Sequence, residues 1–397
     1  MAAFITNGDN TTQNQHDVNF AAIWEHYRLA SFLYPAKLEL LKPVMDRINK
    51  GWPALLAAPA DIFHMHLARK GSTILSSICA FRDIQDTYVI QHAVSQGQPQ
   101  HMIECLLSIT STASRDPNAR FVSMYFRPES RWPVRLVRAV RGLHPPELTS
   151  LTTREYLTCD PRGAAATLLD RSPVEEVEVE ANPELSSLTV ASLGSLRATA
   201  AGIGASEGNL KSLTERYSKF GLFRERKALG ATRDGVLAGI ALSHASGFPM
   251  NFSFLCGRVE ILVHPEAPDR ANVVRNLACA ALREAALRKE PVCALLVDPK
   301  DTPAAVASGF NATGKQYSNF LWAREGEKGY KSTTIAFERW YARINQRYAR
   351  TSRRSVQSPT QATNREATFG ADHDADPGKV LPELSVRTTH RAKETEK

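Results

Sequence analysis

The stretch from Arg224 to Glu325 constrains the fold more than any other part of this 397-residue chain, because its predicted elements follow a definite order. It begins with two short apolar runs that an Asp-Gly pair separates, which is typical of a β-hairpin. A third apolar run, Arg258 to Val263, precedes a helical pattern from about Ala271 to Leu287. The remaining predicted elements are an apolar strand at 293–298, a short helix at 302–307 and a last strand at 317–322.

The order of hairpin, strand, helix, strand, short helix with Gly309-Phe310, and strand resembles the GNAT (GCN5-related N-acetyltransferase) fold. The resemblance implies a mixed α/β sheet in which the strand at 259–263 splays away from the strand at 294–297. It also implies that acyl-coenzyme A lies in the gap, with its pyrophosphate at the N-terminus of the intervening helix. A helix N-terminus suits that role because its unpaired N–H groups and its dipole attract anions.

The same order of elements occurs once before, between Asp61 and Cys159. Three strand-like runs precede a helical pattern from His101 to Ala113, and another strand, a short helix and a closing strand from Thr153 follow it. The pair Gly142-Leu143 falls where Gly309-Phe310 falls in the later stretch, and Tyr156 falls near the place of Tyr317. We therefore predict a mixed-sheet α/β protein of two GNAT-like acyl-coenzyme A N-acyltransferase units in tandem. An unrelated α+β domain that shares the strand order is the alternative for the first unit.

Composition and periodicity divide the chain further. The acidic run at 175–180 indicates a solvated linker, or an edge strand because glutamate alternates with valine. The last residues are rich in Ser, Thr and Pro with few large apolar side chains, which predicts disorder. The predicted parts are a flexible N-terminus (1–17), an N-terminal GNAT-like domain (18–159), a linker (160–184), a C-terminal GNAT-like domain (185–326), a basic amphipathic helix (329–350) and a disordered tail (351–397).

The overall composition excludes some classes of protein. Hydrophobic residues make up 43% of the chain, which permits packed cores and excludes a wholly disordered protein. A net charge of +8 permits an anionic ligand without requiring nucleic acid. No signal peptide and no apolar run long enough to span a bilayer is seen, so we expect a cytoplasmic protein with reduced cysteines. The sequence shows no complete set of metal ligands, and we expect no metal.

The candidate cofactor residues lie around the end of the strand at 258–263. The GNAT family binds coenzyme A with an Arg/Gln-x-x-Gly-x-Gly/Ala turn, in which small residues let the backbone approach the pyrophosphate. The corresponding segment here contains no glycine, and Asp269 would repel a phosphate. The resemblance implies acetyl-coenzyme A or another acyl-coenzyme A as donor, bound by Leu262, Val263, Arg270, Ala271, Asn272 and Val273.

Three residues are candidates for proton transfer. The family often uses a carboxylate on the third strand as general base, and Glu260 is such a carboxylate. Strand alternation puts His264 on the same face, as a second candidate base. An ion pair between Glu260 and Arg258 is the alternative. Many family members carry a tyrosine four residues before the Gly-Phe pair as the acid, but this chain has Ala305 there, and Tyr317 is the candidate substitute.

Together these residues predict an acyltransferase that moves an acyl group from acyl-coenzyme A to the amine of a small molecule or protein. The active cleft would lie in the second unit, where a strand N–H near Val263 would stabilise the oxyanion formed by direct attack on the thioester. Two alternatives stay open. The degenerate phosphate turn and the missing tyrosine favour an inactive GNAT-like binding or regulatory protein. A tandem GNAT fold is also similar to that of transferases that use aminoacyl-tRNA as donor.

The predicted helix near the C-terminus is amphipathic. Aromatic and apolar side chains follow one side and arginines another. Docking by the aromatic face, with the basic face in water, is one interpretation. Contact with an anionic surface, such as membrane phosphates or nucleic acid, is the other, and it would use Arg339, Arg343, Arg347 and Arg350.

Overall fold

The computed structural model describes residues 12–13, 19–84, 86–96, 99–164, 174–177, 183–203, 209–326 and 329–357. Its first half contains β1 (Thr12–Gln13), α1 (Phe20–Leu29), α2 (Pro35–Leu41), α3 (Met45–Ala57), β2 (Phe63–Lys70), β3 (Thr73–Ile84), β4 (Thr87–Ser95), α4 (Pro99–Arg115), β5 (Phe121–Phe126), α5 (Arg131–Arg141) and β6 (Thr149–Cys159). Its second half contains α6 (Pro161–Ala164), β7 (Val174–Val177), α7 (Pro183–Leu193), α8 (Ser195–Ala200), α9 (Asn209–Ser218), β8 (Arg224–Arg233), β9 (Val236–Ser246), β10 (Arg258–Val263), α10 (Arg270–Leu287), β11 (Cys293–Val297), α11 (Thr302–Ala307), β12 (Asn311–Ala323) and α12 (Lys331–Gln357).

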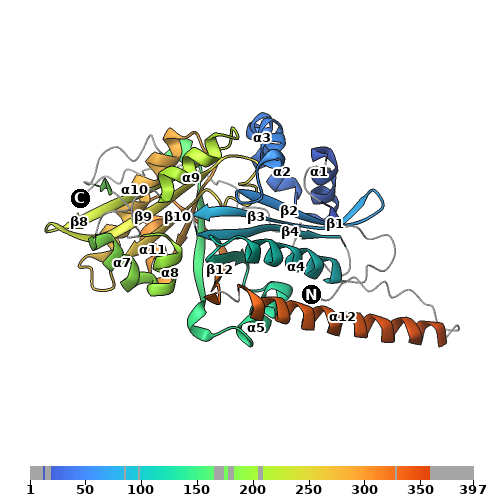
Figure 1. Ribbon diagram of the computed structural model, residues 1–397. Helices are drawn as coiled ribbons and strands as arrows, with labels where there is room; N and C mark the ends of the chain where they lie inside the picture. The colour runs from blue at the N-terminus through green and yellow to red at the C-terminus, as the bar shows by residue number, and fades with distance from the viewer. Residues whose placement is uncertain are drawn as a thin grey trace, which may run out of the picture.

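The strands of the described residues form one mixed sheet with helices on both faces (Figure 1). Its order is β1-β2-β3-β4-β5-β12-β6-β11-β10-β9-β8-β7. The series β2-β3-β4-α4-β5-α5-β6 recurs as β8-β9-β10-α10-β11-α11-β12, and in each series a helix joins a parallel pair, β4 with β5 or β10 with β11. The fold is therefore two GNAT-like α/β units in tandem, as the sequence predicts.

The two units exchange their closing strands. Strand β12 of the second unit lies between β5 and β6, and β6 of the first unit lies between β12 and β11. Phe320 consequently stands opposite Met124, and Tyr156 opposite Leu296. The order of elements predicts Tyr156 near the equivalent of Tyr317, but the register makes it equivalent to Phe320. Its ring contacts that of Tyr317, with centroids 5.1 Å apart. The exchange joins both units into one continuous hydrogen-bonded ladder.

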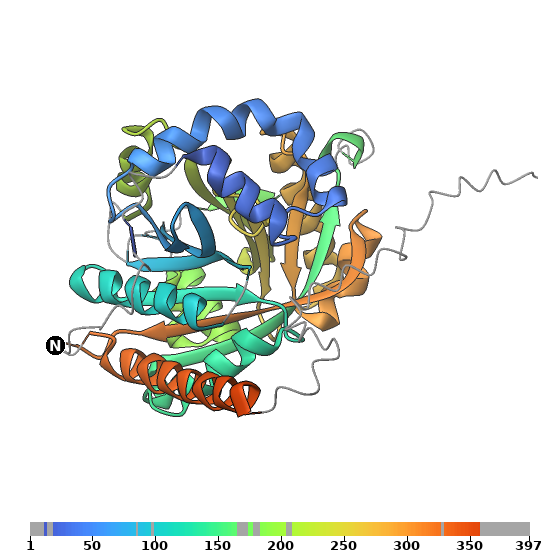
Figure 2. The ribbon, with the colours of Figure 1, turned by 90° about the vertical axis from the view of Figure 1, so that its right-hand side faces the viewer.

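Helices cover the four half-faces of the sheet. In the first half, α1, α2 and α3 lie on one side of the strands, and α4, α5 and α12 lie on the other (Figure 2). In the second half, α10 and α11 pack on one face, and α7 packs on the opposite face. Gly239 on β9 lets α10 approach closely, because a Cβ there would stand 2.8 Å from a methyl group of Val273. The sequence forms these layers because the strands alternate or run apolar and each helix has an apolar stripe.

Three expected boundaries differ from the structure. Within the segment predicted as a flexible N-terminus, Thr12 and Gln13 pair with β2. Within the predicted linker, 174–177 forms β7 at the edge of the sheet, so the described part of the acidic run (175–177) is an edge strand, and 178–180 lie outside the described residues. Helix α12 continues through Gln357, seven residues past the predicted end at Arg350. Of the predicted disordered tail at 351–397, residues 351–357 therefore belong to α12, and 358–397 lie outside the described residues.

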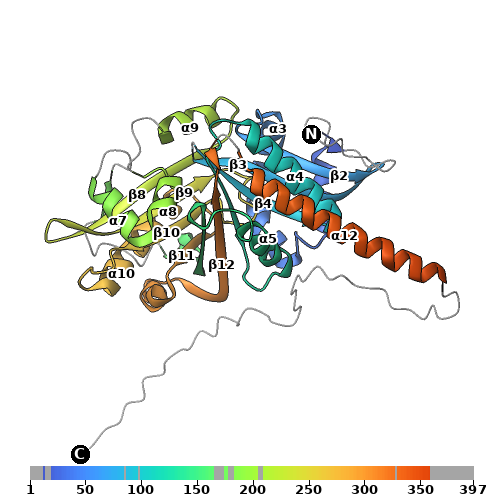
Figure 3. The ribbon, with the colours of Figure 1, turned by 60° about the horizontal axis from the view of Figure 1, so that its bottom comes forward.

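Helix α12 docks by its aromatic face. Phe337 is fully buried, Trp340 and Ile344 pack beside it, and the Tyr341 hydroxyl donates to Glu104 at 2.7 Å. The distal part of the helix extends beyond α4 (Figure 3). These contacts support the docking interpretation of the helix. Arg339 and Arg343 are exposed, whereas the side chains of Arg347 and Arg350 lie outside the described residues. In the part of the chain that the structure describes, no helix has the length and apolarity that a membrane crossing needs.

Candidate functional site

Each unit opens at the carboxyl end of its parallel strand pair. In the second unit the pairing of β10 with β11 ends at Glu260 and Leu296, whereas the pairing of β10 with β9 continues to Val263. In the first unit the pairing of β4 with β5 ends at Ile90 and Met124, although β4 runs on through residue 95. The strands therefore separate beyond these residue pairs. We call the opening between β10 and β11 the second gap, and its counterpart between β4 and β5 the first gap.

Backbone groups of β10 face the second gap. The Arg154 guanidinium donates to the carbonyl of Ile261 at 3.2 Å, and the Ser192 hydroxyl donates to the carbonyl of Val263 at 3.3 Å. The N–H of His264 points the other way and donates to a carbonyl of β9 at 2.9 Å. Because successive residues of a strand alternate in direction, the N–H of Val263 points into the gap. This is the group expected from the sequence to stabilise an oxyanion, a role that stays a prediction.

Arg270 holds the chain around the second gap. Its Nε and Nη2 donate to the two carboxylate oxygens of Asp301 at 2.6 and 2.7 Å. Its Nη1 donates to the carbonyls of Val263 and His264 at 3.3 and 3.2 Å. The side chain thus ties the start of α10 to the end of β10, and Asp301 neutralises its charge. Its predicted role toward a phosphate stays a prediction.

The other predicted cofactor residues divide into core and surface. Leu262 and Val273 are buried, Asn272 is half-buried and Ala271 is exposed in the first turn of α10. The N–H groups of Asn272 and Val273 donate to the carbonyl of Asp269, at 2.9 and 3.2 Å. Those of Arg270 and Ala271 precede this turn, and a helix leaves such groups for outside partners. These two N–H groups and the small Ala271 side chain fit an anion, whereas the carboxylates of Asp269 and Asp301 at the same end oppose one.

The structure brings two of the three predicted catalytic residues together. Glu260 and Tyr317 line one cavity, whereas His264 lies past the end of β10, where its Nδ1 accepts from the N–H of Glu266 at 3.3 Å. Glu260 accepts from Arg258 Nε at 2.7 Å, which is the ion pair expected as the alternative to a role as general base.

The environment of each group sets its protonation. Burial raises the pKa of Glu260, but Arg258 and Arg154 outweigh it, and the pKa lies below its usual range. An ionised carboxylate of low pKa is a weak base. Burial raises the pKa of Tyr317 to about 12, so at neutral pH its phenol is protonated and able to donate. The pair therefore offers a proton donor more readily than a base.

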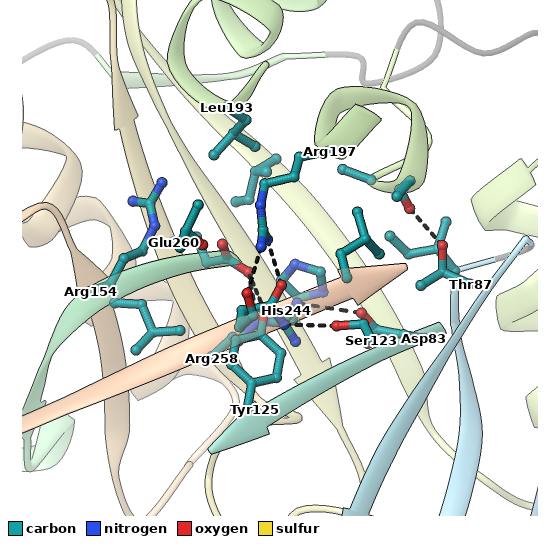
Figure 4. Close-up of a pocket in the computed structure, with 18 of the residues that line it drawn as sticks. Asp83, Thr87, Ser123, Tyr125, Arg154, Leu193, Arg197, His244, Arg258 and Glu260 are labelled. Carbon is teal, nitrogen blue, oxygen red and sulfur yellow. Dashed lines mark hydrogen bonds and ion pairs between the residues drawn. The ribbon is translucent and has the colours of Figure 1, made fainter. Parts of the chain in front are cut away.

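The cavity lies where the exchanged strands meet, beneath α7 and α8, and has a volume of about 60 Å³ (Figure 4). Several of its polar residues were not singled out from the sequence, because each comes from a different element and no local spacing links them. A charge inside an apolar strand was the available signal, as for Arg258 and Glu260 in the run Arg-Val-Glu-Ile-Leu-Val. The polar and charged lining residues are Asp83, Thr87, Ser123, Tyr125, Thr152, Arg154, Arg197, His244, Arg258, Glu260, Tyr317 and Asn319.

Arginines dominate the charge around this cavity. Asp83 is buried between Arg224 and Arg258, and ion pairs join it to both. Arg197 donates instead to neutral acceptors, the Ser150 hydroxyl at 2.7 Å and the side chain and carbonyl of Asn319. Burial lowers the pKa of Arg197 to about 10, which leaves it charged at neutral pH.

His244 adds no positive charge to this group. Burial and the neighbouring Arg258 and Arg224 hold the pKa of the imidazole well below its usual value, so the ring is neutral. Its Nδ1 accepts from Arg224 at 3.2 Å, which puts the proton on Nε2.

Comparison with known proteins gives likenesses of structure. No protein-family model matches the sequence, and no curated protein matches it. A tandem GNAT protein from the clavulanic acid biosynthesis pathway is 14% identical, with 67% of this chain and 84% of that chain covered at a TM-score of 0.36. A GCN5-related N-acetyltransferase-like protein from Streptococcus suis is 14% identical, with 72% and 99% covered at 0.35. The N-myristoyltransferase of Saccharomyces cerevisiae, solved with bound myristoyl-CoA, is 10% identical, with 65% of each chain covered at 0.35. Because these TM-scores lie below 0.5, the assignment of two GNAT-like units rests on the topology of this chain itself.

Proposed function

We propose that this protein transfers an acyl group from acyl-coenzyme A to an amine, with the thioester in the second gap. The observation that carries the proposal is the separation of β10 from β11 beyond Glu260 and Leu296, directly before the N-terminus of α10. A gap of this kind admits an extended thioester along β10, where the N–H of Val263 points into the gap although the carbonyls of Ile261 and Val263 are already bound by side chains. The helix N-terminus, with the exposed Ala271 in its first turn, suits the pyrophosphate.

The proposed reaction is direct transfer. The amine nitrogen attacks the thioester carbon, a C–N bond forms and the C–S bond breaks, and coenzyme A leaves as a thiolate. The N–H of Val263 stabilises the oxyanion of the tetrahedral intermediate. The amine nitrogen loses one proton, to Glu260 or His264, and the thiolate gains one, from the phenol of Tyr317. The products are an amide and free coenzyme A.

The second gap suits a ligand better than the first because of what surrounds it. Polar groups line the second gap, among them Arg154 and Ser192. Around β4 of the first unit, the ring of His92 lies 5.6 Å from that of Phe32 and 5.4 Å from that of Phe252. Close-packed aromatic rings leave little room for a pantetheine chain.

Calorimetric titration with acetyl-coenzyme A and a longer acyl-coenzyme A tests the proposal. Ala271→Trp adds bulk at the start of α10, where the side chain is exposed, and should weaken binding at least tenfold. Leu287→Trp at the opposite end of the same helix, where the side chain is 76% exposed, is the matched control and should bind as the unmodified protein does. Arg270→Ala is less informative because it also leaves Asp301 without its ion pair. Absence of binding at millimolar acyl-coenzyme A would overturn the proposal.

A second candidate is a binding protein without catalysis. Two ion pairs favour it. Asp301 already pairs with Arg270, which would otherwise bind a phosphate, and Arg258 lowers the basicity of Glu260. The two candidates differ in thiol release. Acyl-coenzyme A that binds but releases no free thiol with any of a panel of amines would support the binding protein. Release that depends on the amine would exclude it.

A further inference from the structure

The cavity between the units carries more positive charge than its carboxylates balance. Asp83 and Glu260 are both bound to Arg258, and Asp83 also to Arg224. Within the residues that the structure describes, no carboxylate lies within 4 Å of the guanidinium of Arg154 or of Arg197. Arg197 is buried, and Arg154 is half-buried and acts on Glu260 from beyond ion-pair distance. The cavity therefore keeps a surplus of positive charge, which favours an anion.

Arg154 has the capacity to bind that anion. It reaches the cavity from β6, and Arg197 reaches it from α8, with Glu260 between them (Figure 4). A guanidinium has five N–H donors in a planar fork, and the carbonyl of Ile261 takes one of those of Arg154. The remaining donors match the two oxygens of a carboxylate. Arg197, by contrast, donates hydrogen bonds from Nε and from both terminal nitrogens to Ser150 and Asn319. Its main role is to hold α8 on the exchanged strands.

The size of the cavity limits the anion. A water needs about 10–15 Å³ of such volume, so a cavity of about 60 Å³ holds roughly four to six water-sized groups. This is the size of a carboxylate with one or two further carbons, and too small for a nucleotide or a sugar phosphate. The hydroxyl of Thr152 and the phenol of Tyr317 add neutral hydrogen-bonding groups to the lining.

The cavity is also placed next to the proposed reaction. Glu260 and Leu296 form the last rung of the ladder before the second gap, and both line the cavity. Arg154 lines it as well and contacts the first carbonyl of β10 beyond that rung, that of Ile261. Thr152, Arg154 and Tyr317 on the exchanged strands are half-buried, which puts the access to the cavity along β6 and β12.

We propose that the acceptor is a small amino acid, whose carboxylate binds Arg154 in this cavity while its amine faces the second gap. This inference deepens the proposed function and rests on it for the role of the amine. The binding of the carboxylate itself does not need acyl-coenzyme A. A site that both units build also explains why β6 of the first unit carries an arginine into the second unit.

Titration of the full chain with glycine, glycinamide, acetate and inorganic phosphate tests the carboxylate site. Glycine and acetate should bind, and glycinamide, which lacks the carboxylate, should bind at least tenfold more weakly. Arg154→Gln should weaken glycine binding at least tenfold, and Arg154→Lys should lie between the two, because it keeps the charge without the fork. Arg135→Gln, at an exposed position on α5, is the matched control and should change nothing.

Three binding results would overturn the carboxylate site: equal binding of glycine and glycinamide, glycine binding that Arg154→Gln leaves unchanged, or tighter binding of phosphate than of any carboxylate. Melting temperatures show whether Arg154→Gln folds. If it does not, the affinity of Arg154→Lys for glycine decides whether Arg154 binds the carboxylate. Release of free thiol from acetyl-coenzyme A separates this inference from the proposed function. Turnover with glycinamide as fast as with glycine would refute the amino acid acceptor and leave acyl transfer standing. Glycine binding through Arg154 without any thiol release would refute acyl transfer and leave the carboxylate site standing.

Discussion

The two gaps have the same strand topology, but aromatic rings pack around the first gap and polar side chains line the second. In the first unit, His92 of β4 has a left-handed backbone (φ 50°) where the register with β3 shifts, and its ring packs against Tyr27, Phe32 and Phe252. In the second unit, guanidinium and hydroxyl groups bind the carbonyls at the end of β10. The elements that cover each gap account for the difference. Helix α1 and the 247–257 loop bring apolar side chains to the first, and α7 and β6 bring polar ones to the second.

The strand exchange makes this difference depend on single positions. Glu260 is the last paired residue of β10, and Ile90 is its counterpart on β4. Tyr156 of β6 stands opposite Leu296, and Phe320 of β12 stands opposite Met124. The residues two positions before them, Arg154 on β6 and Ser318 on β12, therefore correspond to each other. One duplicated framework therefore holds a packed core in one half and a charged cavity in the other, because buried side chains differ at equivalent places. The following predictions test that contrast.

The largest effect should be a loss of stability at acid pH that arises mostly in the first unit, which holds four of the five described histidines whose pKa is lowered, the fifth being His244. Burial lowers the pKa of His26 and His64 to about 4, and that of His66 and His92 to about 3. The unfolded chain takes up these protons near pH 6.5, so stability is complete above that pH and falls as the pH drops toward the folded values. Each histidine contributes up to about 1.4 kcal/mol per pH unit.

Melting temperature measured from pH 7.5 to pH 4 tests this prediction. His64→Gln should reduce the slope of melting temperature against pH by the contribution of one histidine. Leu287→Gln, at an exposed position, should leave that slope unchanged. A melting temperature that stays constant between pH 6.5 and pH 4 would contradict the assignment.

Asp83→Asn should cost about 3–5 kcal/mol in the free energy of unfolding, because it leaves Arg224 as a buried charge without its carboxylate and leaves Arg258 with Glu260 alone. Asparagine keeps the size of the side chain, so the loss reports the charge. Asp86→Asn, which breaks a half-exposed ion pair with Arg120, should cost less than about 1 kcal/mol. Urea unfolding measures both, and equal losses would show that the charges at the junction of the units have no special weight.

Phe252→Ala should cost about 3–5 kcal/mol, because the ring is fully buried against His92, Tyr27 and Trp52. Its effect should be on stability, and the binding of acyl-coenzyme A should be unchanged while the protein stays folded. Leu287→Ala controls for truncation at an exposed site. Denaturant unfolding and titration of the same samples give both quantities. A large change in affinity with little change in stability would place the ligand near the first gap instead.

The smallest effect should come from Tyr125→Phe, which removes the hydroxyl that donates to Glu260 at 3.1 Å. We expect a loss of about 1 kcal/mol in unfolding free energy, since Arg258 still satisfies the carboxylate. Tyr34→Phe, at an exposed position, should be neutral. A loss as large as that of Asp83→Asn would mean that Tyr125 organises the whole charged cluster.

Sequence periodicity alone determined the order of elements in both units. Apolar runs such as 293–297 and the helical pattern at 270–287 are local, and the structure has β11 and α10 there. The repeated order predicts the tandem GNAT-like fold because each element type depends on side chains a few residues apart. The ion pair of Glu260 with Arg258 was also open to prediction, as an alternative, because the two residues are neighbours on one face of a strand.

Tertiary structure alone decided which strands pair at the centre and what fills each gap. A closing strand has no local signal for its partner, since either unit offers an open edge with the same hydrogen-bonding groups. The pairing of β6 with β11 and of β12 with β5 therefore appears only in the folded chain. The same holds for the contact of Arg154 with Ile261 and of Arg270 with Asp301, which join residues 107 and 31 positions apart. A charged side chain that leaves water needs a partner, and here residues far apart in the sequence supply it. Only the folded chain therefore shows which residues pair.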